Sequence, residues 1–298
     1  MSTAFRITQR SVAQRTNSNL QYALSRLAKT QEQLSSGRLI SRPSDSPVGT
    51  VSALRFRAEI RQTEQFARNA DDGLAWLGNA DRMLTSSLDQ VRRARELTLQ
   101  GANGSAGPDA RNAIALEIEA IRDSLLGIAN SQHAGRPLFG GTGEATRPYA
   151  PDGSYIADPP GPVVVARAVA PGESVRINIT GPEVFGPEGA NLFDVLTQIA
   201  DDLRNDPAGL AGGMNALDER MRGITDALGD IGARTNRLEV MRDRAVDQIG
   251  ALKHNLSEVE DIDLPATIMD LQLQETAYKA ALSATARVLQ PSLVDFLR

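Results

Sequence analysis

Residues 210–259, LAGGMNALDERMRGITDALGDIGARTNRLEVMRDRAVDQIGALKHNLSEV, carry apolar side chains in two interleaved sets that each repeat every seven residues. The first set is Leu210, Leu217, Ile224, Ile231, Leu238, Ala245, Leu252 and Val259. The second is Met214, Met221, Leu228, Thr235, Arg242, Ile249 and Leu256. Heptads sustained over this length are typical of a long helix packed against other helices. The stretch predicts one helix of about 75 Å, at about 1.5 Å per residue.

Further apolar stripes predict helices on both sides of this one. A first helix carries a leucine heptad and stops at Gly37, since glycine is a natural helix C-cap. Residues 42–49, RPSDSPVG, hold two prolines and a glycine and are expected to form a loop. Helices are also expected over about residues 50–100, around 114–128 and at 191–205. A last helix follows Pro265.

The middle of the chain differs in composition. Nine of the 15 prolines lie between Pro137 and Pro187, and ten of the 25 glycines lie between Gly135 and Gly189. Two β-branched runs, residues 163–165 and 175–180 (VRINIT), are bounded by Pro-Gly turns and are expected to be strands.

The predicted fold is therefore mainly α with an inserted β module. We expect an N-terminal coiled-coil arm at residues 1–45 and a helical core domain from residues 46–134 and 191–260. The β module would take residues 135–190, and a C-terminal coiled-coil arm residues 261–298. Because the helical arms flank the insertion, they are expected to pair antiparallel. Amphipathic end helices without a globular core of their own suit assembly with other chains.

Composition argues against several classes of function. The chain has no cysteine and only two histidines, His133 and His254, which excludes thiolate sites and any multi-histidine metal site. A net charge of −5 gives no support for a nucleic-acid partner. Residues 1–10, MSTAFRITQR, contain no apolar core, so no secretory signal peptide is expected, and no membrane span is expected either. We expect no enzyme activity, catalytic residue, cofactor or metal.

Three segments, in order, resemble the motifs of the bacterial flagellin family. They are residues 34–47 (LSSGRLISRPSDSP), residues 95–105 (RELTLQGANGS) and residues 261–273 (DIDLPATIMDLQL), the last followed by LVDFLR at 293–298. Residues 135–142 (GRPLFGGT), 191–196 (NLFDVL) and 231–239 (IGARTNRLE) resemble the branch that joins the hook to the filament. Ser46 stands where that branch has a second aspartate.

The resemblance implies a flagellin-like fold, with long antiparallel coiled-coil helices from both chain ends and a small outer β domain. It implies a structural subunit of the extracellular bacterial flagellum, exported by the flagellar type III secretion apparatus with the help of an export chaperone. The expected partners are further copies in a ring, hook-associated protein 1 and flagellin. The residues expected at the assembly interface are Leu20, Leu24, Leu27, Leu34, Ile268, Leu271, Leu282 and Leu289.

Two other interpretations of the function remain open. The chain could be flagellin itself, the filament subunit, although its hairpin segment and its Asp295-Phe296-Leu297 ending argue against this. A cytosolic coiled-coil scaffold or signalling protein would explain the heptads but not the three ordered family motifs.

Overall fold

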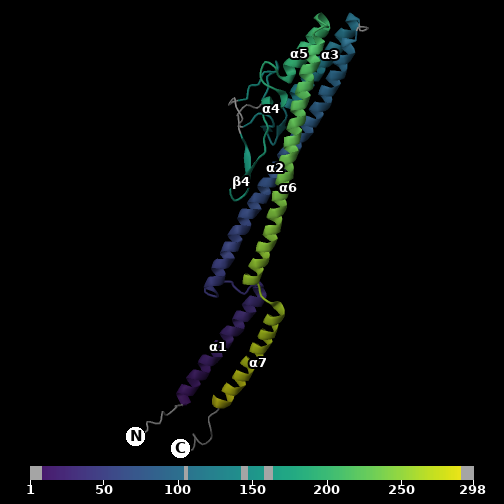
Figure 1. Ribbon diagram of the computed structural model, residues 1–298. Coiled ribbons are helices and arrows are strands. Elements are labelled where there is room, and N and C mark those ends of the chain that lie inside the picture. The colour runs from purple at the N-terminus through teal and green to yellow at the C-terminus, as the bar shows by residue number, and fades with distance from the viewer. Residues whose placement is uncertain (1–8, 104–106, 142–146, 158–163, 290–298) are drawn as a thin grey trace, which may run out of the picture. The chain divides into compact units, whose positions relative to one another are not determined.

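The computed structural model describes residues 9–103, 107–141, 147–157 and 164–289, with side chains from residue 14 to residue 286. The helices are α1 (Gln9–Ser36), α2 (Pro47–Ala102), α3 (Pro108–Ala129), α4 (Gly181–Phe185), α5 (Leu192–Asn205), α6 (Leu210–Glu260) and α7 (Leu264–Leu289). The strands are β1 (Gln132–His133), β2 (Arg136–Pro137), β3 (Ala166–Ala170) and β4 (Glu173–Arg176). Figure 1 shows the long helices and the small strand-bearing module, so the mainly α fold with an inserted β module is confirmed.

The chain divides into two compact units. Unit 1 comprises residues 1–61 and 249–298, and unit 2 comprises residues 62–248. These divisions fall inside α2 and α6, whereas the sequence placed the arm boundaries between residues 45 and 46 and between residues 260 and 261. The five-part division stays a prediction.

Unit 2 is a bundle in which the long parts of α2 and α6 run beside α3 and α5 (Figure 1). The predicted seam faces its core, since Leu217, Ile224 and Leu238 are completely buried. Gly73 of α2 lies so close to Leu238 that a Cβ there would be 2.8 Å from the leucine Cδ1. A glycine at this position thus lets the two helices approach each other.

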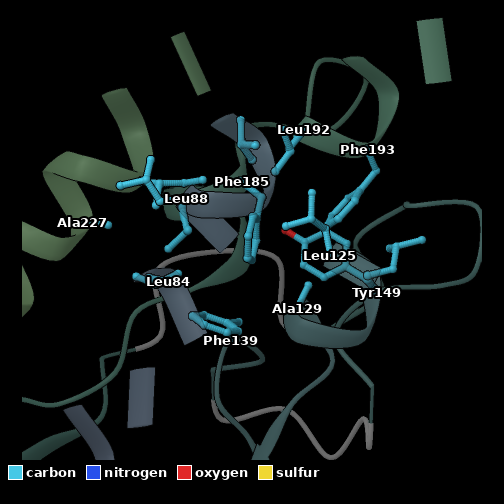
Figure 2. Close-up of a cluster of buried hydrophobic side chains, with 14 of the residues drawn as sticks. Leu84, Leu88, Leu125, Ala129, Phe139, Tyr149, Phe185, Leu192, Phe193 and Ala227 are labelled. Atoms are coloured by element: carbon cyan, nitrogen blue, oxygen red, sulfur yellow. The ribbon is translucent and has the colours of Figure 1, made fainter. Parts of the chain in front are cut away.

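The β module closes over an aromatic cluster. Tyr149, Phe185 and Phe193 pack with ring centroids 5.0–5.9 Å apart, and Phe139 lies 5.5 Å from Phe185. Figure 2 shows these rings beside Leu84 and Leu88 of α2 and Leu125 of α3. Five of the twelve aromatic residues of the chain, these four and Tyr155, thus lie where the module meets the helices.

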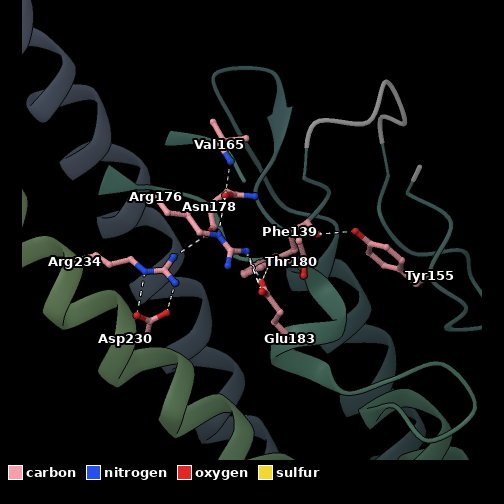
Figure 3. Close-up of polar contacts among 9 residues, drawn as sticks. All are labelled: Phe139, Tyr155, Val165, Arg176, Asn178, Thr180, Glu183, Asp230 and Arg234. Atoms are coloured by element: carbon pink, nitrogen blue, oxygen red, sulfur yellow. Dashed lines mark hydrogen bonds and ion pairs between the residues drawn. The ribbon is translucent and has the colours of Figure 1, made fainter. Parts of the chain in front are cut away.

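A polar network fastens the same module to α6 (Figure 3). The Asn178 side-chain oxygen accepts hydrogen bonds from the Val165 N–H at 2.8 Å and from Arg176 Nε at 3.2 Å. Arg234 of α6 donates to the Asn178 carbonyl at 2.9 Å. Arg176 also pairs with Glu183 at 2.7 Å.

Two local expectations were wrong in part. The loop expected at residues 42–49 ends at Ser46, and α2 begins at Pro47 because proline fits the first turn of a helix. Val164 and Val165 lie outside any strand, residues 177–180 continue beyond β4, and Val163 is outside the described residues. The turn at Gly172, with φ of +76°, pairs Ala166 with Arg176, so the hairpin takes the first two residues of the second predicted run and none of the first.

Candidate assembly surfaces

Unit 1 is built on an antiparallel pair of helices, α1 and α7, which lie side by side in Figure 1. Of the eight residues predicted for assembly, Leu20, Leu27, Leu34 and Leu271 are half-buried. Leu24, Ile268 and Leu282 are exposed. The side chain of Leu289 lies outside the described residues. The structure thus brings the two predicted sets onto one pair of helices, but it encloses neither.

This pair has almost no core of its own. Among the described side chains of α1 and α7, Thr30 alone is buried, and its hydroxyl lies 3.2 Å from the side-chain oxygen of Gln274. A fully buried leucine side chain stabilises a fold by about 1.5–3 kcal/mol, and the described part of this pair contains none. The remaining apolar surface is available to another chain.

The segments at residues 37–39 and 260–262, together called the joint, connect the α1–α7 pair to the start of α2 and the end of α6. Gly37, with φ of +72°, ends α1, and its carbonyl accepts the Ile262 N–H at 3.1 Å. The Leu39 N–H donates to the Glu260 carbonyl at 2.7 Å. The buried Glu260 carboxylate pairs with Arg38 at 3.2 Å and with Arg57 at 2.5 Å. Two cations therefore converge on one carboxylate where the α1–α2 and α6–α7 connections meet.

The loop of residues 38–46 is held by Asp45. Its carboxylate accepts the N–H groups of Arg42 at 2.9 Å and Ser41 at 3.2 Å, and it pairs with Lys29 at 3.1 Å. The backbone hydrogen bond from Arg42, followed by the side-chain hydrogen bond from Lys29, lowers the pKa of Asp45. The motif at residues 34–47 thus serves as the structural connection between α1 and α2.

Both histidines lie beside other side chains of the fold. His133 Nδ1 lies 2.6 Å from Asn79 Nδ2, and its ring meets Trp76 edge-on at 5.6 Å. His254 is exposed and lies 3.5 Å from Glu258. Within the described ranges, no three His, Cys, Asp or Glu side chains gather where they could hold a metal ion. Among the described helices, none is both long enough and apolar enough to cross a membrane.

Sequence reasoning missed Glu260 and Thr30. Both are polar, so a search for apolar periodicity assigns them to a solvated face. Glu260 stands in the acidic run EVEDID at residues 258–263, which contains the break between α6 and α7. An acidic residue at a break that faces an arginine-rich loop is a signal that could have found it.

Comparison with known proteins identifies the family. The bacterial flagellin N-terminal helical region matches residues 7–144, and the C-terminal helical region matches residues 214–297. The chain is 26% identical over 286 residues to flagellar hook-associated protein 3 of Escherichia coli, covering 86% of this chain and 88% of that protein. It is 27% identical over 281 residues to flagellin of Bacillus subtilis, covering 88% and 89%.

A solved structure has a similar fold. The flagellar junction protein FlgL from Legionella pneumophila superposes with a TM-score of 0.58 at 16% identity, over 70% of this chain and 99% of that one. Because the two helical-region matches together span well over half of the sequence, in the order predicted by its motifs, the chain belongs to the bacterial flagellin family.

Proposed function

We propose that this chain is a structural subunit of the hook–filament junction, forming a ring between hook-associated protein 1 and the flagellin filament outside the cell. The observation that carries the proposal is the α1–α7 pair, whose apolar residues are half-buried or exposed. A junction subunit needs such surfaces, because it must bind its own copies and a different protein on each face.

One local feature favours a junction subunit over a filament subunit. The segment GRPLFGGT, which resembles the junction branch, begins in the β1–β2 hairpin, where Ala134 and Gly135 both have positive φ. Leu138 and Phe139, which follow it, are buried in the unit 2 core. Similar proteins named flagellar hook-associated protein 3 support the same choice.

The proposal includes a route and a physical mechanism. The chain would leave the cell through the flagellar type III secretion apparatus, with an export chaperone protecting its apolar C-terminal helix beforehand. Assembly would be driven by burial of the α1 and α7 apolar residues, at about 25 cal/mol per Å² of apolar area, and would involve no catalysis.

The test is deletion of the gene, followed by electron microscopy and a search for flagellin in the medium. Bare hooks with flagellin shed into the medium are expected, because exported flagellin subunits would then have no junction ring on which to assemble. Bare hooks with no flagellin anywhere would identify the chain as flagellin, the second candidate. Intact filaments, in a strain without a second copy of the gene, would refute both.

A further inference from the structure

Two exposed apolar surfaces of opposite charge lie in unit 1, near the joint. The α2 surface consists of Val48, Val51 and Leu54, in the first two turns of α2. The α7 surface consists of Met269 and Leu273, which are four residues apart and so share one face of α7. All five residues are more than half exposed. Scattered single apolar residues are common on protein surfaces, whereas rows of them are typical of binding sites.

The α2 surface lies in a basic environment. Residues 38–61 contain five arginines and only two acidic residues, a net charge of +3. A cleft of about 240 Å³ connects the apolar row to these cations, since Leu54 lines it together with Arg38 and Arg57. Both of these arginines share the single carboxylate of Glu260, whereas Arg42 and Arg55 pair with Glu32 and Glu59. With Lys29, Glu32 and Glu260 included, six cations face four carboxylates, a net charge of +2. The site therefore has an excess of positive charge beside an apolar row.

The α7 surface lies in an acidic environment. Apart from the buried Glu260, which pairs with Arg38 and Arg57, residues 258–270 contain four acidic residues and no lysine or arginine. Asp261, Asp263 and Asp270 accept hydrogen bonds from Ser257, the Ala266 N–H and Gln274 respectively. In the part of the chain that the structure describes, none of these three carboxylates is paired with a cation. The site therefore has an excess of negative charge beside an apolar row.

The two surfaces do not cover each other in one chain. In the view of Figure 1, the first turns of α2 and of α7 lie on either side of the end of α1. The side chains of both surfaces are exposed in the single chain. They match in chemistry, because each combines exposed apolar side chains with an excess of charge of the opposite sign.

We infer that the α7 surface of one copy docks on the α2 surface of the next, so that the occupant of each surface is a second copy of this chain. Two different surfaces on one protein give a heterologous contact, which forms a ring when its rotation closes. Charge complementarity fixes which surface meets which, because like surfaces repel. The inference rests on the proposed ring and assigns the contact between its neighbouring subunits.

Disulfide trapping in assembled flagella tests this contact. Because the natural chain has no cysteine, introduced thiols are the only ones that it carries. Cells that make the doubly substituted chain, Val51→Cys with Met269→Cys, are checked for swimming, and their isolated flagella are oxidised and run on a non-reducing gel. We expect a ladder of disulfide-linked dimers, trimers and larger species of this chain.

Matched variants define the outcome. Val51→Cys alone and Met269→Cys alone should stay monomeric, since a heterologous contact never places like with like. Val51→Cys with Val246→Cys, whose second site is an exposed valine of unit 2, should also stay monomeric. Swimming cells whose doubly substituted chain remains monomeric would overturn this contact while leaving the junction proposal intact. A ladder from the Val246→Cys pair would overturn it as well. If the doubly substituted cells do not swim, Val48→Cys with Leu273→Cys replaces that pair.

Discussion

At the scale of single residues, Tyr149 is the most constrained side chain of unit 2. It is 1% exposed and contacts the rings of Tyr155, Phe185 and Phe193. Its hydroxyl is buried and has no hydrogen-bond partner among the described residues. Burial of this kind raises the pKa of Tyr149, because the phenolate would lose its hydration.

Tyr149 is therefore expected to make unit 2 sensitive to alkali. Below about pH 10 the ring is protonated in both the folded and the unfolded chain, so it has no effect on the pH dependence. Above that pH only the unfolded chain releases the proton, so the free energy of unfolding falls, by about 1.4 kcal/mol at pH 11. Tyr149→Phe should be as stable as the natural chain at pH 7 and should lose less stability at pH 11, measured by urea unfolding. Tyr22→Phe, at an exposed position, is the control, and equal alkaline losses in both variants would contradict the expectation.

Gly181 gives a second prediction at this scale. A Cβ at this position would clash with the buried ring of Tyr149, which the surrounding aromatic side chains hold in place. Gly181→Ala should lower the free energy of unfolding of unit 2 by about 1–3 kcal/mol, as overpacking generally does. Gly127→Ala is the matched control. It lies in α3 with nothing within 4 Å of its added Cβ and should stabilise the protein by about 0.4–1 kcal/mol. Equal effects of the two changes in thermal unfolding would refute this account.

At the scale of helices, the joint depends on one carboxylate from α6 that serves both the α1–α2 loop and α2. Arg38 and Arg57 are partly exposed, whereas Glu260 is buried. Removing Glu260 is therefore expected to destabilise the joint more than removing either arginine. An incomplete buried charge network costs folding free energy, whereas a partly exposed arginine can be hydrated instead.

Glu260→Gln is expected to loosen the joint. The neutral amide retains the shape but leaves both guanidinium groups without a counter-charge, at a cost of about 1–3 kcal/mol. Amide hydrogen exchange should become faster for α1 and α7 and stay unchanged for the part of α2 inside unit 2. Glu258→Gln removes an exposed carboxylate two residues away and should change neither. Unaltered exchange in the Glu260 variant would show that the backbone hydrogen bonds alone hold the joint.

A charge in the middle of α1 tests the assembly role of that helix. Leu27 is half-buried on the pair, and Leu27→Asp would place a carboxylate on the apolar face that another chain is proposed to cover. The variant should remain a soluble monomer but fail to assemble, so cells should carry bare hooks. Ser25→Asp adds the same charge at an exposed position two residues away and should swim normally. Normal filaments in the Leu27 variant would refute the assembly role.

At the scale of the whole molecule, the apolar core is unevenly distributed between the units. The completely buried leucine, isoleucine and phenylalanine side chains all belong to residues 62–248 in the described structure. Because local stability follows buried apolar contacts, the units should not open together.

We therefore expect two stages of unfolding. Scanning calorimetry should show a first, small transition that removes the helical signal of α1 and α7, followed by a larger one for unit 2. Hydrogen exchange should protect the unit 2 helices more strongly than α1 and α7. A single transition, with equal protection throughout, would contradict this division.

The sequence predicted most of the fold and part of the candidate site, for identifiable reasons. The positions of Leu217, Ile224 and Leu238 follow from heptad spacing, because burial on a helix is periodic. The role of Glu260 does not, because an ion pair depends on two residues far apart in sequence. The exact strand positions were not predicted either, since the turn at Gly172, rather than the β-branched residues of the two runs, determines which residues pair.

The pairing of α1 with α7 also determines the order in which the molecule can be completed. More than two hundred residues separate the two helices in sequence, whereas all of unit 2 lies between them. Contacts at such separation form late, because a long loop must close first. Unit 2 can thus fold while α1 still has no partner. A chain that lacks α7 leaves α1 unpaired, so completion of unit 1, unlike that of unit 2, depends on the last helix.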